Sequence, residues 1–275
     1  MRILVTTDDG VKSLGFLTLV YALRLRCKLT PEVKVIAVAP REDRSGCGSS
    51  AQLAGLLHLN YHALTELVSG AWCENEIVSL DGTPIDCIKY GLDVYQPDWV
   101  FAGLNFGANV GRNILTSGTV CAAAFAAQAG IPAVAISQDA RAAAENGPYR
   151  ACREIVAVVR ELLGRRPPQG AFYNVNLPNA DRKLLGTIGV SEAGVGGYLS
   201  VVTRQGSAVK FDYGWQTLSK PEKLLDQGYA VVQTFKPFES IGGWPGDRRC
   251  VEKPSRKASR SSRSSAGAAK RSGRG

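Results

Sequence analysis

Short apolar runs and longer segments with helical spacing alternate along the first 180 residues of the chain. Apolar runs rich in β-branched residues, which are typical of buried strands, occur at Arg2–Thr7, Val33–Ala39, Trp99–Gly103, Ala133–Ser137 and Phe172–Val175. Segments with the length and apolar spacing of helices lie between or after them, at Leu14–Leu25, Gly118–Ala129 and Tyr149–Leu163. Strands that are almost entirely apolar and are separated by helices are typical of a parallel sheet covered on both faces. The pattern therefore predicts an α/β fold.

A short strand and the start of a further helix fit the same alternation. Glu76–Leu80 has the composition of a strand, and a helix is expected to begin soon after it. Thr83 is a typical N-cap, Pro84 occupies the first helical position, and Asp86 stands where it completes a capping box. Glu or Gln is usual at that last position, so Asp86 is a variant of the motif.

The pattern changes after Pro178. The segments that follow are shorter and richer in glycine, and they predict hairpins or an arm at Gly194–Thr203, Ala208–Tyr213 and Tyr229–Phe235. We therefore expect an α/β core over residues 1–180, a hairpin and oligomerisation region over residues 181–252, and a tail over residues 253–275. The expected fold class is α/β, a Rossmann-like three-layer sandwich with a mostly parallel sheet and a C-terminal β-hairpin or arm.

The net charge of +9 is concentrated in the basic tail, residues 253–275. This tail holds eight Lys and Arg residues and no acidic residue, whereas the rest of the chain carries 25 basic and 24 acidic residues. Because the tail contains no large apolar residue, it is predicted to be disordered. It is either a solvated extension or an arm that contacts a polyanion such as RNA or polyphosphate.

The overall composition is typical of a globular protein, with 45% hydrophobic and 21% charged residues in a chain of 275. No run approaches the roughly 18 apolar residues of a membrane span. Two acidic residues follow the first strand before the apolar stretch of a signal peptide could form, so we expect a cytoplasmic protein. The seven cysteines are scattered and include no CxxC pair, which argues against a structural zinc site or a disulfide framework.

Polar residues that could bind a cation follow two of the predicted strands, at the sheet edge where ligands of parallel sheets bind. Asp8 and Asp9 follow the first strand, and two adjacent carboxylates repel each other unless a cation such as Mg²⁺ or Mn²⁺ lies between them. Alternatively, Asp8 and Asp9 form with Gly10 a turn that caps the next helix, and this interpretation fits the sequence equally well. Asn105–Gly111 follows the strand Trp99–Gly103 and offers amide oxygens and unhindered N–H groups, or forms a turn without function.

Two further segments could complete such a site. Ser117, Gly118 and Thr119 stand at the start of a predicted helix, where free N–H groups bind anions or where Ser117 acts only as a cap. Arg41–Gly46 follows the second strand and is either a solvated charged loop or a source of hydroxyl and carboxylate groups. Because all four segments fall at strand ends or at a helix start, they could form a single site assembled from several loops. An acidic pair, neutral oxygen donors and a helix N-terminus together indicate metal–phosphate chemistry.

The same segments resemble, in order, the SurE (stationary-phase survival protein) nucleotidases. The matching residues are Ile3–Gly10, Val38–Pro40 with Arg44–Gly46, Gly82–Cys87, Gly103–Gly111, Ser117–Val120, Gly130–Ala133 and Asn174–Pro178. Members of this family remove phosphate from nucleoside monophosphates with the help of a divalent cation. The resemblance therefore implies a nucleotidase that acts on 5′-monophosphates alone or on both 5′- and 3′-monophosphates. Such an enzyme is a phosphoric monoester hydrolase of the acid-phosphatase type, with one Mg²⁺ or Mn²⁺ per subunit.

The resemblance also implies roles for individual residues. The implied metal ligands are Asp8, Asp9, Ser45 and Asn105. The residues implied to line the phosphate pocket are Asn109, Ser117, Gly118 and Thr119. Asp8 and Asp9 are the implied catalytic residues, with water activated by the cation as the nucleophile or Asp8 attacking directly. The resemblance further implies a homo-oligomer, either a dimer or a tetramer, that acts on nucleoside monophosphates.

Three positions depart from the family pattern. The family usually has Asn in place of Thr7, His in place of Ser49, and a Thr-Asp pair in place of Lys220-Pro221. His58 and His62 match no catalytic position and are interpreted as structural or surface residues. These departures leave open an alternative function, a degenerate and non-catalytic SurE-like protein that binds polyanions through its basic tail.

Overall fold

The computed structural model describes residues 1–26, 33–63, 76–139, 147–179, 182–191, 197–205, 207–216 and 219–237. The chain divides into two units, Met1–Phe238 and Glu239–Gly275. All the described residues belong to the first unit, so the basic tail lies outside them.

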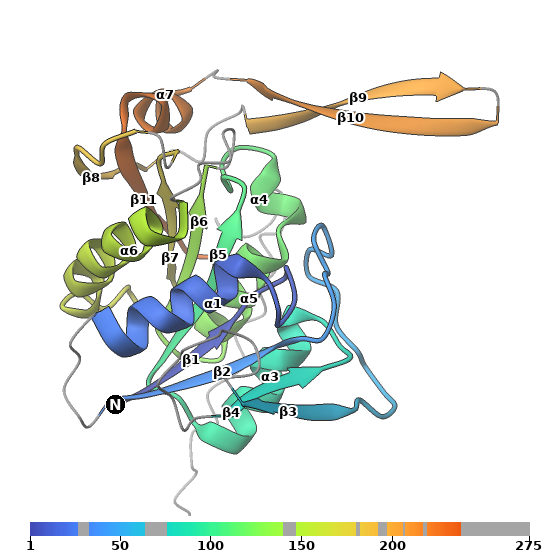
Figure 1. Ribbon diagram of the computed structural model, residues 1–275, viewed down its shortest axis with the longest axis vertical. Coiled ribbons are helices and arrows are strands. Elements are labelled where there is room, and N and C mark those ends of the chain that lie inside the picture. Colours follow the sequence, from blue (N-terminus) through green and yellow to red (C-terminus); the bar gives the residue numbers. More distant parts are fainter. Residues whose placement is uncertain are drawn as a thin grey trace, which may run out of the picture. The chain divides into compact units, whose positions relative to one another are not determined.

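A nine-stranded sheet forms the centre of the first unit (Figure 1), in the order β3-β4-β2-β1-β5-β6-β7-β11-β8. Its strands are β1 (Arg2–Thr6), β2 (Lys34–Pro40), β3 (Leu59–Ala63), β4 (Glu76–Leu80), β5 (Trp99–Phe106), β6 (Ala133–Gln138), β7 (Phe172–Leu177), β8 (Gly186–Gly189) and β11 (Tyr229–Phe235). Only the β3–β4 and β11–β7 pairings are antiparallel among these described strands. The predicted α/β fold with a mostly parallel sheet is confirmed.

Helices cover both faces of this sheet. They are α1 (Leu14–Tyr21), which continues as the π-helical turn η1 (Ala22–Arg26), α3 (Pro84–Tyr95), α4 (Asn113–Thr116), α5 (Gly118–Gln128), α6 (Gly147–Leu163) and α7 (Lys220–Gln227). Ile3 and Val5 of β1 lie in the core beneath α1 and α6, whereas Leu4 lies in the opposite core beneath α3 and α5. Successive side chains of a strand point to opposite faces, so β1 is buried on both sides, as its continuous apolar sequence predicts.

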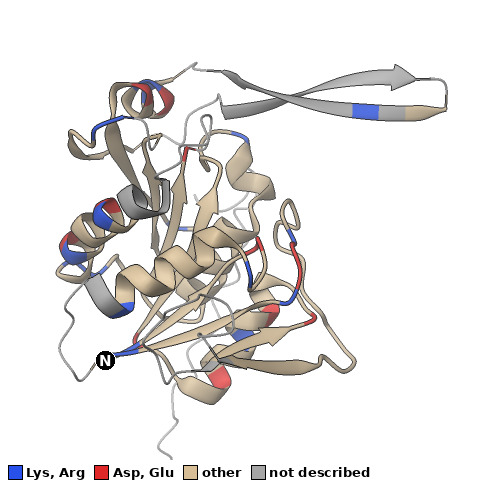
Figure 2. Ribbon diagram, viewed as in Figure 1, with Lys and Arg blue, Asp and Glu red and all other residues tan. Residues whose placement is uncertain are grey.

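Charged residues are confined largely to helices and loops (Figure 2). In the described strands of the large sheet, the charged residues stand at first positions: Arg2 of β1, Lys34 of β2 and Glu76 of β4. No helix within the described ranges is long and apolar enough to cross a membrane.

Two local features fix the start of α3 and the packing of α1. The Thr83 side chain accepts a hydrogen bond from Asp86 N–H, and Asp86 Oδ2 accepts one from Thr83 N–H at 2.9 Å, so the predicted capping box is confirmed. Gly15 lets α1 pack directly on β5, because a Cβ at this position would come within 2.1 Å of the Leu104 carbonyl oxygen. A larger residue at position 15 would push the helix off the strand.

The C-terminal region differs in part from the prediction. The hairpin is confirmed: β9 (Gly197–Gln205) and β10 (Ala208–Gln216) pair with each other as a separate antiparallel sheet. Tyr229–Phe235, expected in a hairpin or arm, instead forms β11, which joins the large sheet between β7 and β8. The sequence pattern does not predict which strand β11 pairs with, because a short apolar strand can pair with any exposed sheet edge. The sequence also did not predict β3, β8, α4 or α7.

Candidate active site

The carboxyl ends of three neighbouring strands bring the predicted ligands together. In the sheet order β2-β1-β5, the segment after β1 lies between the loops that follow β2 and β5. Arg44 N–H donates to the Asp8 carbonyl oxygen at 2.6 Å, which ties the loop after β2 to the end of β1. One N–H and one hydroxyl, both of Thr119 in the first turn of α5, donate to the Asp8 side chain. The site is therefore built from segments more than 100 residues apart in the chain.

Asp8 is buried, with 2% of its surface exposed, and Thr119 donates hydrogen bonds to both of its carboxylate oxygens. The Thr119 hydroxyl lies 2.5 Å from Oδ1, and the Thr119 N–H lies 3.1 Å from Oδ2. Burial raises the pKa of Asp8 above its ordinary value, although both hydrogen bonds from Thr119 act in the opposite direction. The carboxylate is thus held in one orientation at the start of α5, where the helix dipole favours negative charge.

Asp9 is the second carboxylate of the pair. Burial, followed by the negative charge of Asp8, raises the pKa of Asp9 to about 6, against the opposing effect of a hydrogen bond from Ser45. The Ser45 hydroxyl lies 3.1 Å from Asp9 Oδ1. Keeping both carboxylates ionised at neutral pH therefore has a free-energy cost that a bound cation would offset.

Asp43 is a third carboxylate at the site and was not among the predicted site residues. Its Oδ1 accepts hydrogen bonds from the Ser45 hydroxyl at 2.6 Å and from the Ser45 N–H at 2.7 Å. Its charge also contributes to raising the pKa values of Asp8 and Asp9. The sequence feature that could have indicated Asp43 is its position two residues before Ser45 in a charged loop, a spacing typical of an Asx turn.

Asn105 lies near the end of β5 and Asn109 in the segment that follows this strand, and their contacts differ. Asn105 Nδ2 donates to the Gly107 carbonyl at 2.6 Å, which leaves the amide oxygen as the group available to a cation. Asn109 is buried, and its Nδ2 donates to the Ser137 hydroxyl at 2.8 Å. The hydrogen bonds of Asn109 therefore run toward β6 and β7.

The segment Ser117–Thr119 begins α5 as predicted. The Ser117 hydroxyl accepts from Val120 N–H at 3.1 Å, so Ser117 is the N-cap. Gly118 packs against the site, because a Cβ there would come within 2.8 Å of both Asp8 Cβ and Cys47 Sγ. The side chain and N–H of Thr119 both bind Asp8, a partner that the sequence did not reveal.

The donor set suits a hard divalent cation. No group of three or more His, Cys, Asp or Glu residues that could hold a metal occurs in the described part of the chain. The groups that could hold a cation at this edge are the Asp8 and Asp9 carboxylates and the neutral oxygens of Ser45 and Asn105. An all-oxygen set with two carboxylates is typical of Mg²⁺ and Mn²⁺ sites.

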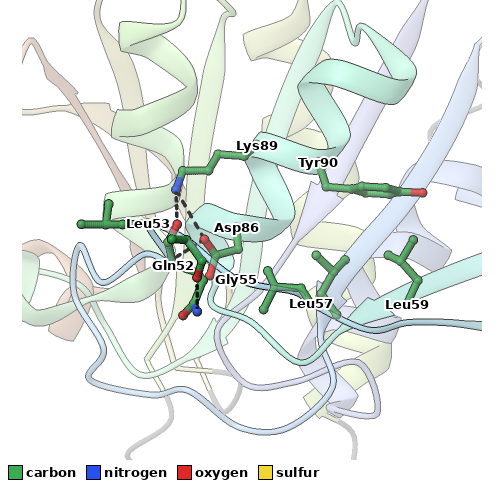
Figure 3. A pocket seen from close by; sticks show the side chains of 10 residues that line it. Gln52, Leu53, Gly55, Leu57, Leu59, Asp86, Lys89 and Tyr90 are labelled. Atoms are coloured by element: carbon green, nitrogen blue, oxygen red, sulfur yellow. Dashed lines mark hydrogen bonds and ion pairs between the residues drawn. The ribbon is translucent and has the colours of Figure 1, made fainter.

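A separate pocket of about 320 Å³ lies at the N-terminus of α3 (Figure 3) and contains none of the predicted site residues. Its polar groups satisfy one another: Asp86 Oδ1 accepts from Gln52 N–H at 2.9 Å and lies 3.5 Å from Lys89 Nζ. Lys89 Nζ also donates to the Gln52 carbonyl at 3.0 Å. These bonds hold the loop after residue 51 against α3, so we interpret the pocket as structural.

The two histidines have structural partners. His58 Nδ1 lies 3.0 Å from Asp81 Oδ2, and His62 Nε2 lies 2.8 Å from the Ser79 hydroxyl. Both contacts join the β3 region to the end of β4. This agrees with their interpretation as structural or surface residues.

The family model described as Survival protein SurE matches residues 3–199. The chain belongs to the SurE family. One relative, 5′-nucleotidase SurE from Geobacter sulfurreducens, is 37% identical over 247 residues, which cover 88% of this chain and 81% of the relative. The protein of the same name from a Thermoanaerobacter species is 31% identical over 88% of this chain and 90% of its own length. The crystal structure of the SurE protein from Aquifex aeolicus has a similar fold, with a TM-score of 0.69 and 26% identity, and covers 86% of this chain and 93% of that one.

Proposed function

We propose that the protein is a nucleotidase that depends on a divalent cation and hydrolyses the phosphomonoester of nucleoside 5′-monophosphates, and also of 3′-monophosphates. The observation that carries this proposal is the pair Asp8 and Asp9, partly desolvated beside the start of α5 and next to Ser45. Relatives that share 31–37% of their residues with this chain over most of its length are 5′-nucleotidases by name. In wider terms the reaction is that of an acid-phosphatase-type phosphoric monoester hydrolase.

The residues of the site would bind the cation and orient the phosphate of the substrate. Asp8, Asp9, Ser45 and Asn105 would hold one Mg²⁺ or Mn²⁺. When bound, such a cation acts as a Lewis acid that polarises a phosphate oxygen and lowers the pKa of water. At the start of α5 the Thr119 and Val120 N–H groups already donate to Asp8 and Ser117, so the Gly118 N–H would be the one that stabilises negative charge on the phosphate oxygens. Both Asp8 oxygens already accept hydrogen bonds from Thr119, which favours water over Asp8 as the nucleophile.

We also propose that the protein acts as a homo-oligomer, a dimer or a tetramer. The large sheet ends at β3 on one side and β8 on the other, and strand edges are common sites of association.

An activity assay tests the proposal directly. Purified protein is given 5′-AMP, 3′-AMP, GMP and 4-nitrophenyl phosphate with Mn²⁺ or Mg²⁺, and then excess EDTA. We expect phosphate release that EDTA abolishes and that added cation restores. Release that is unaffected by EDTA would contradict the cation dependence, and no release from any of these esters would contradict the phosphatase activity.

Thr119→Val tests the orientation of Asp8, because valine keeps the shape of threonine and lacks the hydroxyl that donates to Asp8 Oδ1. Replacing a group that orients a metal ligand lowers metal affinity by about 10- to 100-fold, so we expect the cation to bind more weakly by roughly that factor. Thr119→Ser keeps the hydroxyl and is the matched control, with near wild-type affinity in a calorimetric titration. Equal affinity in the two variants would show that the hydroxyl plays no part.

The basic tail supports a second candidate activity, the binding of a polyanion such as RNA or polyphosphate. Its eight basic residues are unopposed by any acidic residue, and such a segment binds polyanions in a salt-dependent manner. A chain truncated after Glu252 should keep its full phosphatase activity and lose salt-sensitive binding to RNA, measured by fluorescence anisotropy. Loss of phosphatase activity would contradict the assignment of catalysis to residues 1–252, and unchanged RNA binding would contradict the role of the tail.

A further inference from the structure

The segment after β5 depends on side chains for its hydrogen bonds. Residues 107–112 form neither helix nor strand, yet Asn109 within them is only 5% exposed. Buried peptide groups need hydrogen-bond partners, and Asn109 lies beyond the last residue pair of β5 and β6, Phe106 and Gln138. Asn176 of β7 supplies both partners: its Oδ1 accepts from Asn109 N–H at 2.7 Å, and its Nδ2 lies 3.1 Å from the Asn109 carbonyl oxygen. The side-chain amide thus takes the place of a neighbouring strand.

Further buried polar groups support the same residue. Asn174 Nδ2 donates to the Asn109 carbonyl at 2.9 Å and to Gln233 Oε1 of β11 at 2.9 Å. Ser137, Asn174, Asn176 and Gln233 are all at most 1% exposed. Amides at alternate positions of a strand that is buried on both faces break the apolar pattern of the other central strands. Such local exceptions are expected where a strand supports a functional site.

This network is connected to the proposed cation ligand. Gly107 N–H donates to the Gln138 carbonyl at 2.8 Å, and the Gly107 carbonyl accepts from Asn105 Nδ2 at 2.6 Å. The position of Gly107 therefore decides which way the Asn105 amide oxygen points. Asn109 lies two residues further along the same segment, and its peptide is held by Asn176.

We propose that Asn176 is a positioning residue for the site: by pairing with the Asn109 peptide it fixes the segment that orients Asn105 toward the cation. This inference rests on the proposed function. Residues that orient the ligands of a metal change affinity or activity by about 10- to 100-fold when they are replaced.

Asn176→Ala and Val175→Ala form a matched pair of variants. Val175 is the preceding residue of β7 and is also fully buried, but its side chain packs in the opposite core with α1 and α6. Both replacements should lower the melting temperature. We expect only Asn176→Ala to weaken the binding of Mn²⁺ about ten-fold or more, measured by calorimetry without nucleotide, and to lower kcat. Similar Mn²⁺ affinity and kcat in the two variants would overturn the positioning role.

Asn176→Asp gives a reversible version of the same test, and it decides the matter if Asn176→Ala does not fold. A protonated Asp has one donor and one acceptor and can make both bonds to the Asn109 peptide, whereas an ionised Asp has no donor. Burial raises the pKa of such a carboxyl. We therefore expect the Mn²⁺ affinity of the variant, as a ratio to wild type at each pH, to approach one in acid and to fall as the pH rises. A ratio that does not change with pH would overturn the proposal.

The wild-type protein separates this inference from the function on which it rests. If wild-type protein neither binds Mn²⁺ nor releases phosphate, the proposed function fails and the positioning role fails with it. If wild-type protein does both and Asn176→Ala behaves like Val175→Ala, only the positioning role fails.

Discussion

Replacing Asp9 with Asn should make the cation-free protein more stable at pH 7.5, although it removes a proposed metal ligand. Burial and the charge of Asp8 raise the pKa of Asp9 from 3.8 to about 6, so the folded state is penalised for ionising this group. Asn has the same size, can still accept from the Ser45 hydroxyl and carries no charge. One pKa unit corresponds to about 1.4 kcal/mol, so we expect the free energy of unfolding to rise by about 1–3 kcal/mol.

The stabilisation by Asp9→Asn should depend on pH in a defined direction. Because the pKa of Asp9 is higher in the folded state than in the unfolded state, the folded state binds more protons between about pH 4 and pH 6. The free energy of unfolding of the wild type therefore falls as the pH rises through this window and remains lower above it. Asp9→Asn has no carboxyl at this position, so its free energy of unfolding does not fall in this way. Urea unfolding in EDTA should show a difference between variant and wild type at pH 7.5 that closes below pH 4.

Adding the cation should make the wild type more stable than Asp9→Asn. A ligand at 100 times its dissociation constant stabilises the state that binds it by about 2.7 kcal/mol, and this gain should be largely absent in Asp9→Asn. Asp43→Asn is the control, since Asp43 also raises the pKa of Asp9 but is not among the proposed ligands. It should keep the stabilisation by Mn²⁺. An Asp9→Asn protein that is less stable than wild type in EDTA at pH 7.5, or equally stabilised by Mn²⁺, would contradict the assignment of Asp9.

The sequence predicts those parts of the fold that depend on local patterns. β1 is recognisable because its central residues, Ile3, Leu4 and Val5, are buried on both faces and are all apolar. The start of α3 is recognisable because Thr83, Pro84 and Asp86 each satisfy a local requirement of a helix N-terminus. By contrast, the position of β11 in the sheet depends on pairing with β7, which precedes it by more than 50 residues. No local sequence pattern predicts this pairing.

The same distinction applies to the candidate site. The segments that carry Asp8, Ser45 and Asn105 could be proposed as parts of one site because each follows a predicted strand, and parallel strands align their carboxyl ends. The roles of these individual residues came from the resemblance to the SurE family. The contact between Asp8 and Thr119 spans 111 positions and has no sequence signature. The support of Asn109 by Asn176 is similar, since the sequence shows only a polar residue in an apolar strand and not the peptide that it binds.

Gly118→Ala should abolish most of the activity while leaving the fold intact. Alanine is about 1 kcal/mol better than glycine inside a helix, so the change favours α5 itself. Its Cβ, however, would lie 2.8 Å from Asp8 Cβ and 2.9 Å from Asp8 Oδ2, and real Cβ atoms do not approach other atoms so closely. Either Asp8 or the start of α5 must move. A displacement of about 1 Å in a catalytic group lowers the rate about 100-fold, and we expect kcat/KM to fall by at least that factor.

Gly91→Ala is the matched control for Gly118→Ala. A Cβ at Gly91 of α3 would come within 2.4 Å of Leu4 Cδ2, in the core on the same face of the sheet but away from the carboxylates. This variant should have a lower melting temperature than the wild type but a kcat/KM within about two-fold of the wild-type value, since it disturbs packing alone. The double variant Gly118→Ala/Cys47→Ala removes the contact with Cys47 Sγ but not the one with Asp8, so it should recover little activity. Full recovery in the double variant would show that the displaced group is the loop carrying Cys47, and that the close packing of Gly118 on Asp8 is not what the activity requires.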